Sequence, residues 1–252
     1  MILSLATRPR DAHADHEIPA VFCLPFAGGG ASSYRTWRRA LADSATVYAL
    51  ELPGHETALV QSCLTDREAL IGAVTACIAE NAARRPYVIY GHSFGGILAF
   101  HVIPRLLALG CPPQRLVVGA CRPPGDPPVV FEVERYDDDT LLATLRDELE
   151  HGETERTAFL ADPEVRKLFL PPLRADLDID GNIRTLPGAP LPVEVVAVSG
   201  SDDPWASAAV MRGWSAWSPA GFRHETLEGG HFFTPSLARS PERLRALLFA
   251  PL

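Results

Sequence analysis

The sequence predicts an α/β fold in which helices cover both faces of a mostly parallel central sheet. Short apolar runs rich in β-branched residues alternate along the chain with segments whose apolar residues recur every three or four positions. This alternation is typical of parallel sheets that are buried on both faces. The 252 residues, 47% of them hydrophobic, suffice for one α/β unit with a single sizeable core.

Five of the predicted strands are short apolar runs, and several of these runs end at a turn signal. In chain order the apolar runs are Ala20–Leu24, Val47–Leu52, Tyr87–Tyr90, Arg115–Ala120 and Val193–Val198, and the short run His224–Leu227 is a further, weaker strand prediction. Helical periodicity marks three segments, one in each of the first three intervals between consecutive runs. These segments are Tyr34–Leu41, Asp66–Ala83 and Gly96–Leu109.

The alternation is interrupted between about residues 122 and 190. This stretch opens with several prolines and continues with two polar amphipathic helical patterns, Asp138–Glu148 and Thr154–Phe169; Pro171-Pro172 and the acidic Asp176–Asp180 follow. An insertion of this length between two strands is typical of an active-site lid.

Residues at the start of the chain are polar and aperiodic. We therefore predict three parts, namely an N-terminal arm over 1–17, a core formed by 18–121 and 191–252, and a helical lid insertion over 122–190.

Composition argues against several classes of protein. With 23 Lys+Arg against 31 Asp+Glu the net charge is −8, which disfavours a nucleic-acid partner. No apolar run approaches the roughly 18 residues of a membrane span, and the first residues lack a secretory signal pattern, so we expect a cytoplasmic protein without a membrane partner. The five cysteines form no C-x-x-C pattern, which disfavours a disulfide framework or a zinc site.

The segment Gly91-His92-Ser93-Phe94-Gly95 follows a predicted strand and precedes a predicted helix. This is the G-x-S-x-G pattern in the strand–turn–helix setting that exposes a nucleophilic serine. A nucleophile at such a tight turn needs neighbours without side chains, and the helix N-terminus beneath it favours developing negative charge. The pattern alone would also suit a plain turn, but the setting favours Ser93 as the nucleophile.

A nucleophilic serine needs a general base and an acid that orients the base. Asp202 and Asp203 follow the run Val193–Val198, and His231 follows two glycines near the C-terminus. The chain order serine, aspartate, histidine is that of α/β-hydrolases and differs from the serine-protease orders. We predict His231 as the base and favour Asp203 over Asp202 as the acid, with a turn-capping role for the other aspartate.

Two further histidines are interpreted as residues other than the general base. His92 adjoins Ser93 along the chain and is interpreted as a packing or shaping residue. His55 lies in the loop after the second predicted strand, where it could line the mouth of the site.

An acyl-transfer enzyme also needs donors for the tetrahedral oxyanion. One is the backbone N–H of Phe94, and the second is expected from the loop after the first core strand, where we favour the N–H of Ala27. The triple glycine of this loop could instead hold a phosphate, but it lacks both the P-loop and the dinucleotide spacing.

At this point the chain resembles the type II thioesterases that accompany polyketide synthases and nonribosomal peptide synthetases. The resemblance extends over nearly the whole chain in the segments LPFAGGGASSYRTW (24–37), LELPGHE (50–56), YGHSFGGILAF (90–100), LFLPPLRAD (168–176), GSDDPW (200–205) and LEGGHFF (227–233). His55 stands where the family commonly has arginine, and Phe94 where it commonly has methionine.

The resemblance implies an α/β-hydrolase fold with a helical lid and hydrolysis of acyl or aminoacyl thioesters from the phosphopantetheine arm of acyl or peptidyl carrier proteins. By position it assigns Ser93, Asp203 and His231 to catalysis and Ala27 and Phe94 to the oxyanion hole. It implies no metal and no other cofactor. The alternatives are acyl transfer or cyclisation by the same triad and a non-catalytic carrier-protein binding module.

Overall fold

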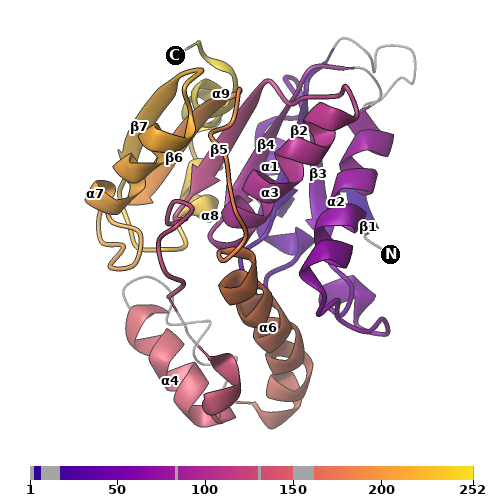
Figure 1. Cartoon of the computed structure of the whole chain (residues 1–252), viewed down its shortest axis with the longest axis vertical. Coiled ribbons are helices and arrows are strands. Elements are labelled where there is room, and N and C mark those ends of the chain that lie inside the picture. The colour runs from indigo at the N-terminus through magenta and orange to yellow at the C-terminus, as the bar shows by residue number, and fades with distance from the viewer. Residues whose placement is uncertain (1–2, 7–17, 83–84, 130–131, 150–161, 252) are drawn as a thin grey trace.

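A computed structural model of the chain describes residues 3–6, 18–82, 85–129, 132–149 and 162–251. Its centre is a seven-stranded sheet with the order β1-β3-β2-β4-β5-β6-β7 (Figure 1). All neighbours are parallel except β1, which runs antiparallel to β3. The strands are β1 (Leu3–Ala6), β2 (Ala20–Leu24), β3 (Thr46–Glu51), β4 (Tyr87–His92), β5 (Arg115–Gly119), β6 (Glu194–Gly200) and β7 (Phe222–Leu227).

The predicted α/β fold with a mostly parallel sheet is confirmed, and each predicted apolar run lies on a strand. Strands β2 to β5 are buried along their whole length, as expected where helices cover both faces of a sheet.

The first strand differs from the prediction of an N-terminal arm. Residues 3–6 form β1 and pair with β3, with Leu3 opposite Glu51 and Ala6 opposite Tyr48. This pairing satisfies the backbone N–H and C=O groups on the outer side of β3 and makes β1 the edge strand of the sheet. The rest of the predicted arm lies outside the described residues.

Helices cover the two faces of the sheet (Figure 1). The long helices α2 (Arg67–Ala82) and α3 (Phe94–Ala108) pack together on one face, and α3 contacts β2, β4 and β5. On the other side α9 (Pro241–Phe249) packs on β4 and β5, and α1 (Arg35–Ala40) on β3. Shorter elements complete the core, namely α7 (Ala208–Met211), α8 (Thr234–Leu237), η1 (Ala31–Tyr34), η2 (Glu56–Ala58) and η4 (Arg212–Trp217).

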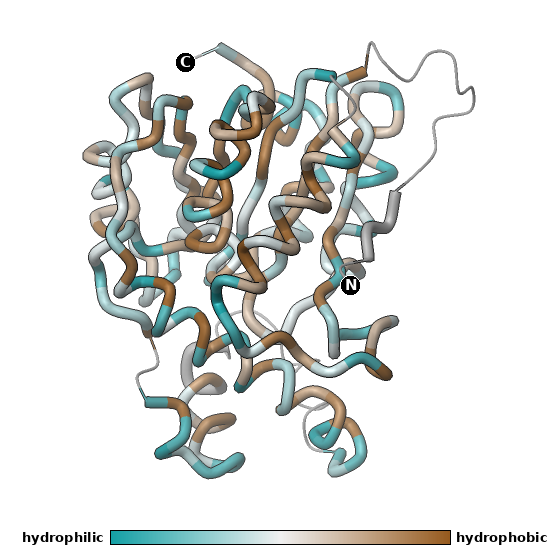
Figure 2. Tube along the Cα trace, turned by 45° about the vertical axis from the view of Figure 1, so that its right-hand side comes forward, coloured by the Kyte–Doolittle hydropathy of each residue, from teal (hydrophilic) through white to brown (hydrophobic). Residues whose placement is uncertain are grey.

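Two helices of the segment between β5 and β6 lie beyond one edge of the sheet, at the bottom of Figure 1. They are α4 (Asp138–Leu149), which follows the short η3 (Val133–Arg135), and α6 (Pro163–Ile183). Both alternate between hydrophilic and hydrophobic residues in Figure 2, as amphipathic helices do. Their apolar sides form a second hydrophobic cluster around Leu141, Leu142, Leu170 and Leu173.

Helix α6 continues through Pro171 and Pro172, although the sequence places these prolines after a helix. Each proline removes one backbone donor, which normally disrupts a helix interior. The carbonyls that lose their donors belong to Lys167 and Leu168, both on the exposed side, where water can satisfy them. On the opposite side, Leu170 and Leu173 pack in the second hydrophobic cluster with α4, and Ile179 and Ile183 pack in the main core, which holds the helix in place.

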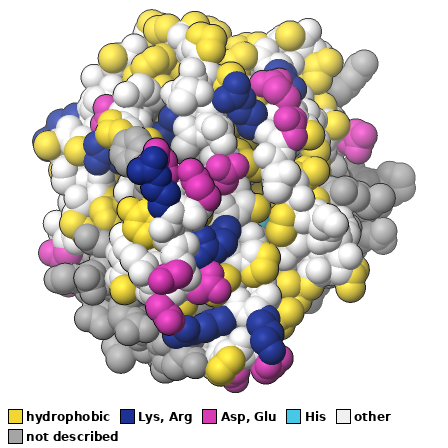
Figure 3. Space-filling model, turned by 60° about the horizontal axis from the view of Figure 1, so that its bottom comes forward, with side chains coloured by type: hydrophobic (Ala, Val, Ile, Leu, Met, Phe, Trp, Pro, Cys, Tyr) yellow, Lys and Arg dark blue, Asp and Glu magenta, His cyan; other side chains and the backbone are white. Residues whose placement is uncertain are grey.

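Ion pairs tie the outer surfaces of these two helices together. Arg166 contacts Asp139 at 2.6 Å, and Arg174 contacts Asp138 at 2.6 Å while donating to the carbonyl oxygens of η3 and its neighbour. The space-filling view of this end shows positive and negative side chains interspersed rather than gathered by sign (Figure 3). In the described part of the chain, no helix is long and apolar enough to cross a membrane.

Candidate active site

Ser93 lies at a sharp turn between β4 and α3, where its backbone adopts φ 51° and ψ −118°. This region is sparsely populated by residues with a side chain and costs about 1–3 kcal/mol. The flanking glycines allow the turn to close: a Cβ atom on Gly91 would collide with the Gly95 carbonyl, and one on Gly95 with the Leu24 carbonyl. The N–H of Ser93 donates to the Gly119 carbonyl oxygen at 2.8 Å, which ties the turn to β5.

His231 and Asp203 form a buried hydrogen-bonded pair, with Nδ1 of His231 2.9 Å from Oδ2 of Asp203. The other carboxylate oxygen accepts the N–H groups of Trp205 and Ala206 at 2.9 and 3.0 Å. Burial raises the pKa of the Asp203 carboxyl, but the hydrogen bond from His231 and these N–H donors outweigh it, so the pKa lies below its usual value. Since the carboxylate only accepts, the proton of His231 lies on Nδ1 and its Nε2 is free to act as a base.

Asp202, the alternative acid, takes a different place. Its side chain is exposed and accepts the Ser201 hydroxyl at 3.0 Å, while its N–H donates to the Gly229 carbonyl oxygen. Of the two aspartates, Asp203 is therefore the one that contacts His231.

His92 supports the main chain of His231. Its ring is fully buried, and Nε2 lies 2.8 Å from the His231 carbonyl oxygen. The Tyr90 hydroxyl lies 2.9 Å from Nδ1. Because a carbonyl oxygen only accepts, Nε2 carries the proton and Nδ1 accepts the Tyr90 O–H. The interpretation of His92 as a shaping residue agrees with this position, but the sequence held no signal for its partner, which lies 139 residues away.

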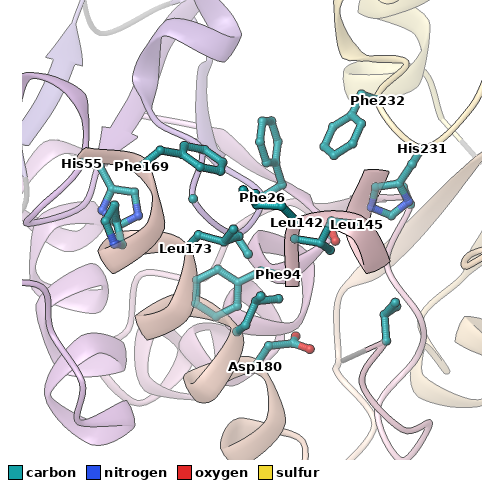
Figure 4. A pocket seen from close by; sticks show the side chains of 18 of the residues that line it. Phe26, His55, Phe94, Leu142, Leu145, Phe169, Leu173, Asp180, His231 and Phe232 are labelled. Carbon is teal, nitrogen blue, oxygen red and sulfur yellow. The ribbon is translucent and has the colours of Figure 1, made fainter. Parts of the chain in front are cut away.

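Ser93 and His231 line one cavity of about 450 Å³ between the core and helices α4 and α6. In Figure 4, His231 and Phe232 lie at one end, His55 and Phe169 at the other, and Phe26 between them. The wall is mostly apolar. The residues that α4 and α6 contribute are Leu142, Leu145, Val165, Leu168, Phe169, Pro172, Leu173, Leu177 and Asp180. Asp180 pairs with Arg184 at 3.2 Å, so the charges of these two lining residues balance each other.

The glycine-rich loop after β2 borders the same cavity through Phe26, Ala27, Gly28 and Gly29. Most of its N–H groups already have acceptors. Those of Gly28, Gly29, Ala31 and Ser32 donate to Asp176, the Phe26 carbonyl, Glu51 and Glu56, respectively. Among the described residues, the N–H of Ala27 has no protein acceptor.

The structure thus brings the five predicted residues Ala27, Ser93, Phe94, Asp203 and His231 together at one end of the sheet, all but Asp203 in the cavity wall. It also places Asp176 beside the loop, a residue that the sequence marked as a member of an acidic run and of the LFLPPLRAD segment but with no role of its own.

Comparison with known proteins adds an independent result. The thioesterase domain family matches residues 19–247. The chain is 32% identical over 213 residues to the thioesterase PikA5 of Streptomyces venezuelae, which covers 84% of this chain and 74% of PikA5. It is 32% identical over 212 residues to the AMB antimetabolite synthetase AmbE of Pseudomonas aeruginosa, which covers 84% of this chain but only 10% of AmbE.

Among solved structures, the type II thioesterase BorB from the borrelidin biosynthetic cluster superimposes with a TM-score of 0.82 at 27% identity, and the alignment covers 96% of both chains. These matches confirm the fold class that was predicted from the chain order of Ser93, Asp203 and His231. They also confirm the family resemblance that was stated from the sequence motifs. The chain belongs to the thioesterase family and has the α/β-hydrolase fold.

Proposed function

We propose that the chain is a serine hydrolase that releases acyl or aminoacyl groups from the phosphopantetheine arm of carrier proteins, with an editing role in polyketide or nonribosomal peptide biosynthesis. The observation that carries the proposal is the shared cavity of Ser93 and His231, with His231 held by the Asp203 carboxylate. Family membership and the likeness to BorB, a thioesterase from a biosynthetic cluster, support the thioester as the bond that is cleaved.

Cleavage proceeds in two steps. Nε2 of His231 takes the proton of the Ser93 hydroxyl as its oxygen attacks the thioester carbonyl, and the same proton passes to the sulfur of the departing pantetheine thiol. Water, deprotonated by His231, then attacks the acyl-serine, and His231 passes that proton to the Ser93 oxygen as the acid is released. Asp203 stabilises the imidazolium that forms in each step.

The oxyanion of each tetrahedral intermediate is assigned to two backbone donors. Phe94 is the first residue of α3, where N–H groups lack partners within the helix. Ala27 is assigned as the second donor because its N–H lacks an acceptor among the described residues, whereas Gly28 and Gly29 donate elsewhere. Two such donors in a site that excludes water are worth several kcal/mol, about 3 kcal/mol for one of them in a comparable hydrolase.

The acyl group is placed in the apolar part of the cavity under α4 and α6. Leucine and phenylalanine side chains from these helices suit an apolar acyl chain, and α4 and α6, which belong to the predicted lid insertion, act as the lid over it.

The experiment is hydrolysis of a panel of acylated carrier proteins, followed by mass spectrometry of the carrier. The full chain is expected to convert acyl carriers to the free-thiol form, and Ser93→Ala is expected to keep the fold and to leave the carriers acylated. Transfer of the acyl group to an added amine or alcohol in place of water would favour acyltransfer, and binding of carriers without turnover would favour a non-catalytic module.

A further inference from the structure

A second buried histidine–carboxylate pair lies at the end of the cavity remote from His231. Nε2 of His55 is 2.9 Å from Oδ2 of Asp176, and the two side chains are 2% and 4% exposed. Nδ1 of His55 lies 3.1 Å from the Pro53 carbonyl oxygen. Both partners are acceptors, so both ring nitrogens donate and His55 is an imidazolium.

The charge of His55 agrees with its surroundings. Burial lowers the pKa of His55, but the hydrogen bond and the charge of Asp176 outweigh it, with further contributions from the Pro53 carbonyl and from Glu51, and the pKa lies above its usual value. The charge of Asp176 also acts on Cys63, whose pKa is raised by burial and by that charge.

The same oxygen of Asp176 also accepts the N–H of Gly28 at 2.8 Å. Gly28 adjoins Ala27, the assigned oxyanion donor. The loop also packs tightly on α6 here, since a Cβ atom on Gly28 would lie 3.1 Å from Cβ of Leu173 and 3.2 Å from Cζ of Phe169. The Asp176 carboxylate therefore joins α6 to two other segments, at His55 and at Gly28, which are 121 and 148 residues away from it in sequence.

The far side of the loop is held independently. Glu51 accepts the N–H of Ala31 at 3.3 Å, and Glu56 accepts the N–H of Ser32 at 3.0 Å. Removal of the Asp176 carboxylate consequently frees the Gly28 end of the loop, next to Ala27, while the other end keeps its anchors.

We propose that Asp176, supported by His55, is a positioning residue for thioester cleavage: it holds Gly28 so that the N–H of Ala27 points at the oxyanion, and it makes this geometry depend on the seating of helix α6. The proposal rests on the proposed function. A donor displaced by a fraction of an ångström loses most of its effect on the transition state while substrate binding is little changed.

The test compares Asp176→Ala with Asp178→Ala, an exposed aspartate two residues along the same helix. For each variant, kcat and KM are measured on an acyl-carrier substrate, together with the affinity for an alkyl boronic acid, which forms a tetrahedral adduct with an active serine. Asp176→Ala is expected to lower kcat about 10- to 100-fold with KM within about threefold, and to weaken boronate binding by a similar factor. Asp178→Ala is expected to match the unmodified chain.

Two further variants separate positioning from stability. Asp176→Asn keeps an oxygen that can accept the Gly28 N–H, and it is expected to recover most of kcat. His55→Leu/Asp176→Leu removes both buried charges, so that neither charge is left unpaired, and it is expected to fold. It still removes the acceptor of the Gly28 N–H and is therefore expected to show the same loss in kcat and in boronate affinity as Asp176→Ala.

A folded His55→Leu/Asp176→Leu protein with unchanged kcat and boronate affinity would overturn the proposal, as would variants of Asp176 that lose thermal stability alone. Failure of the proposed function looks different: the unmodified chain would then leave acyl carriers intact, while the dependence of boronate binding on Asp176 would persist.

Discussion

The carboxylate of Asp203 accepts the Nδ1–H of His231 at 2.9 Å, whereas the adjacent Asp202 faces solvent and contacts Ser201. Asp203→Asn would present an amide to Nδ1 and favour the wrong tautomer of His231. By analogy with the serine-protease aspartate, kcat is expected to fall by about 10⁴. Asp202→Asn serves as the matched control and is expected to change kcat by less than about threefold. The reverse ranking in steady-state kinetics would reassign the acid.

The positive φ of Ser93 predicts a stability difference between two inactive variants. Ser93→Ala keeps a Cβ atom in the strained conformation, whereas Ser93→Gly removes it. Glycine also increases the entropy of the unfolded chain, which offsets part of the gain. Chemical denaturation is expected to find Ser93→Gly more stable than Ser93→Ala by about 1 kcal/mol. Equal stabilities would show that the turn carries little strain.

Glu51 predicts a pH dependence of stability. Burial, with the nearby Glu56 charge, raises its pKa from 4.5 to about 7, against the opposing effect of the Ala31 N–H. Because the folded-state pKa is raised, the stabilising contribution of protonated Glu51 is complete below pH 4.5 and is lost as the pH rises through about 7.

Glu51→Gln stays neutral throughout this range. The difference in melting temperature, Glu51→Gln minus the unmodified chain, is therefore expected to increase between about pH 4.5 and pH 7. At about pH 8 the variant is expected to have the higher melting temperature. The exposed Glu80→Gln provides the control and is expected to show no such trend. A constant difference across the pH range would contradict the raised pKa of Glu51.

The apolar cavity wall predicts selectivity for chain length. Leu145 of α4 lines the cavity and is half-buried, so Leu145→Trp reduces the space with little overpacking. Hydrolysis of a ten-carbon acyl thioester is expected to lose about tenfold or more in kcat/KM, while an acetyl thioester changes within about twofold. Ala143→Trp, on the exposed side of the same helix, is the control. A loss shared equally by both substrates would instead indicate a displaced helix.

The parts that the sequence predicted well depend on local signals. The apolar runs on β2 to β6 and the glycines around Ser93 are readable because strand burial and tight turns impose residue types at consecutive positions. Helix α6 was harder, because Pro171 and Pro172 signal a helix end locally. The contacts of its buried side with the core outweigh that signal, and such contacts are not visible in a single segment.

By itself the sequence determined the strand–turn–helix around Ser93 and the chain order of the three residues assigned to catalysis, since these follow from residue types at short spacing. Only the tertiary structure decided which aspartate reaches His231, that His92 holds the His231 carbonyl, and that Asp176 reaches Gly28. The physical reason is that each of these is a hydrogen bond of about 3 Å between segments 28 to 148 residues apart, and its existence depends on how the sheet and helix α6 pack rather than on any pattern within one segment.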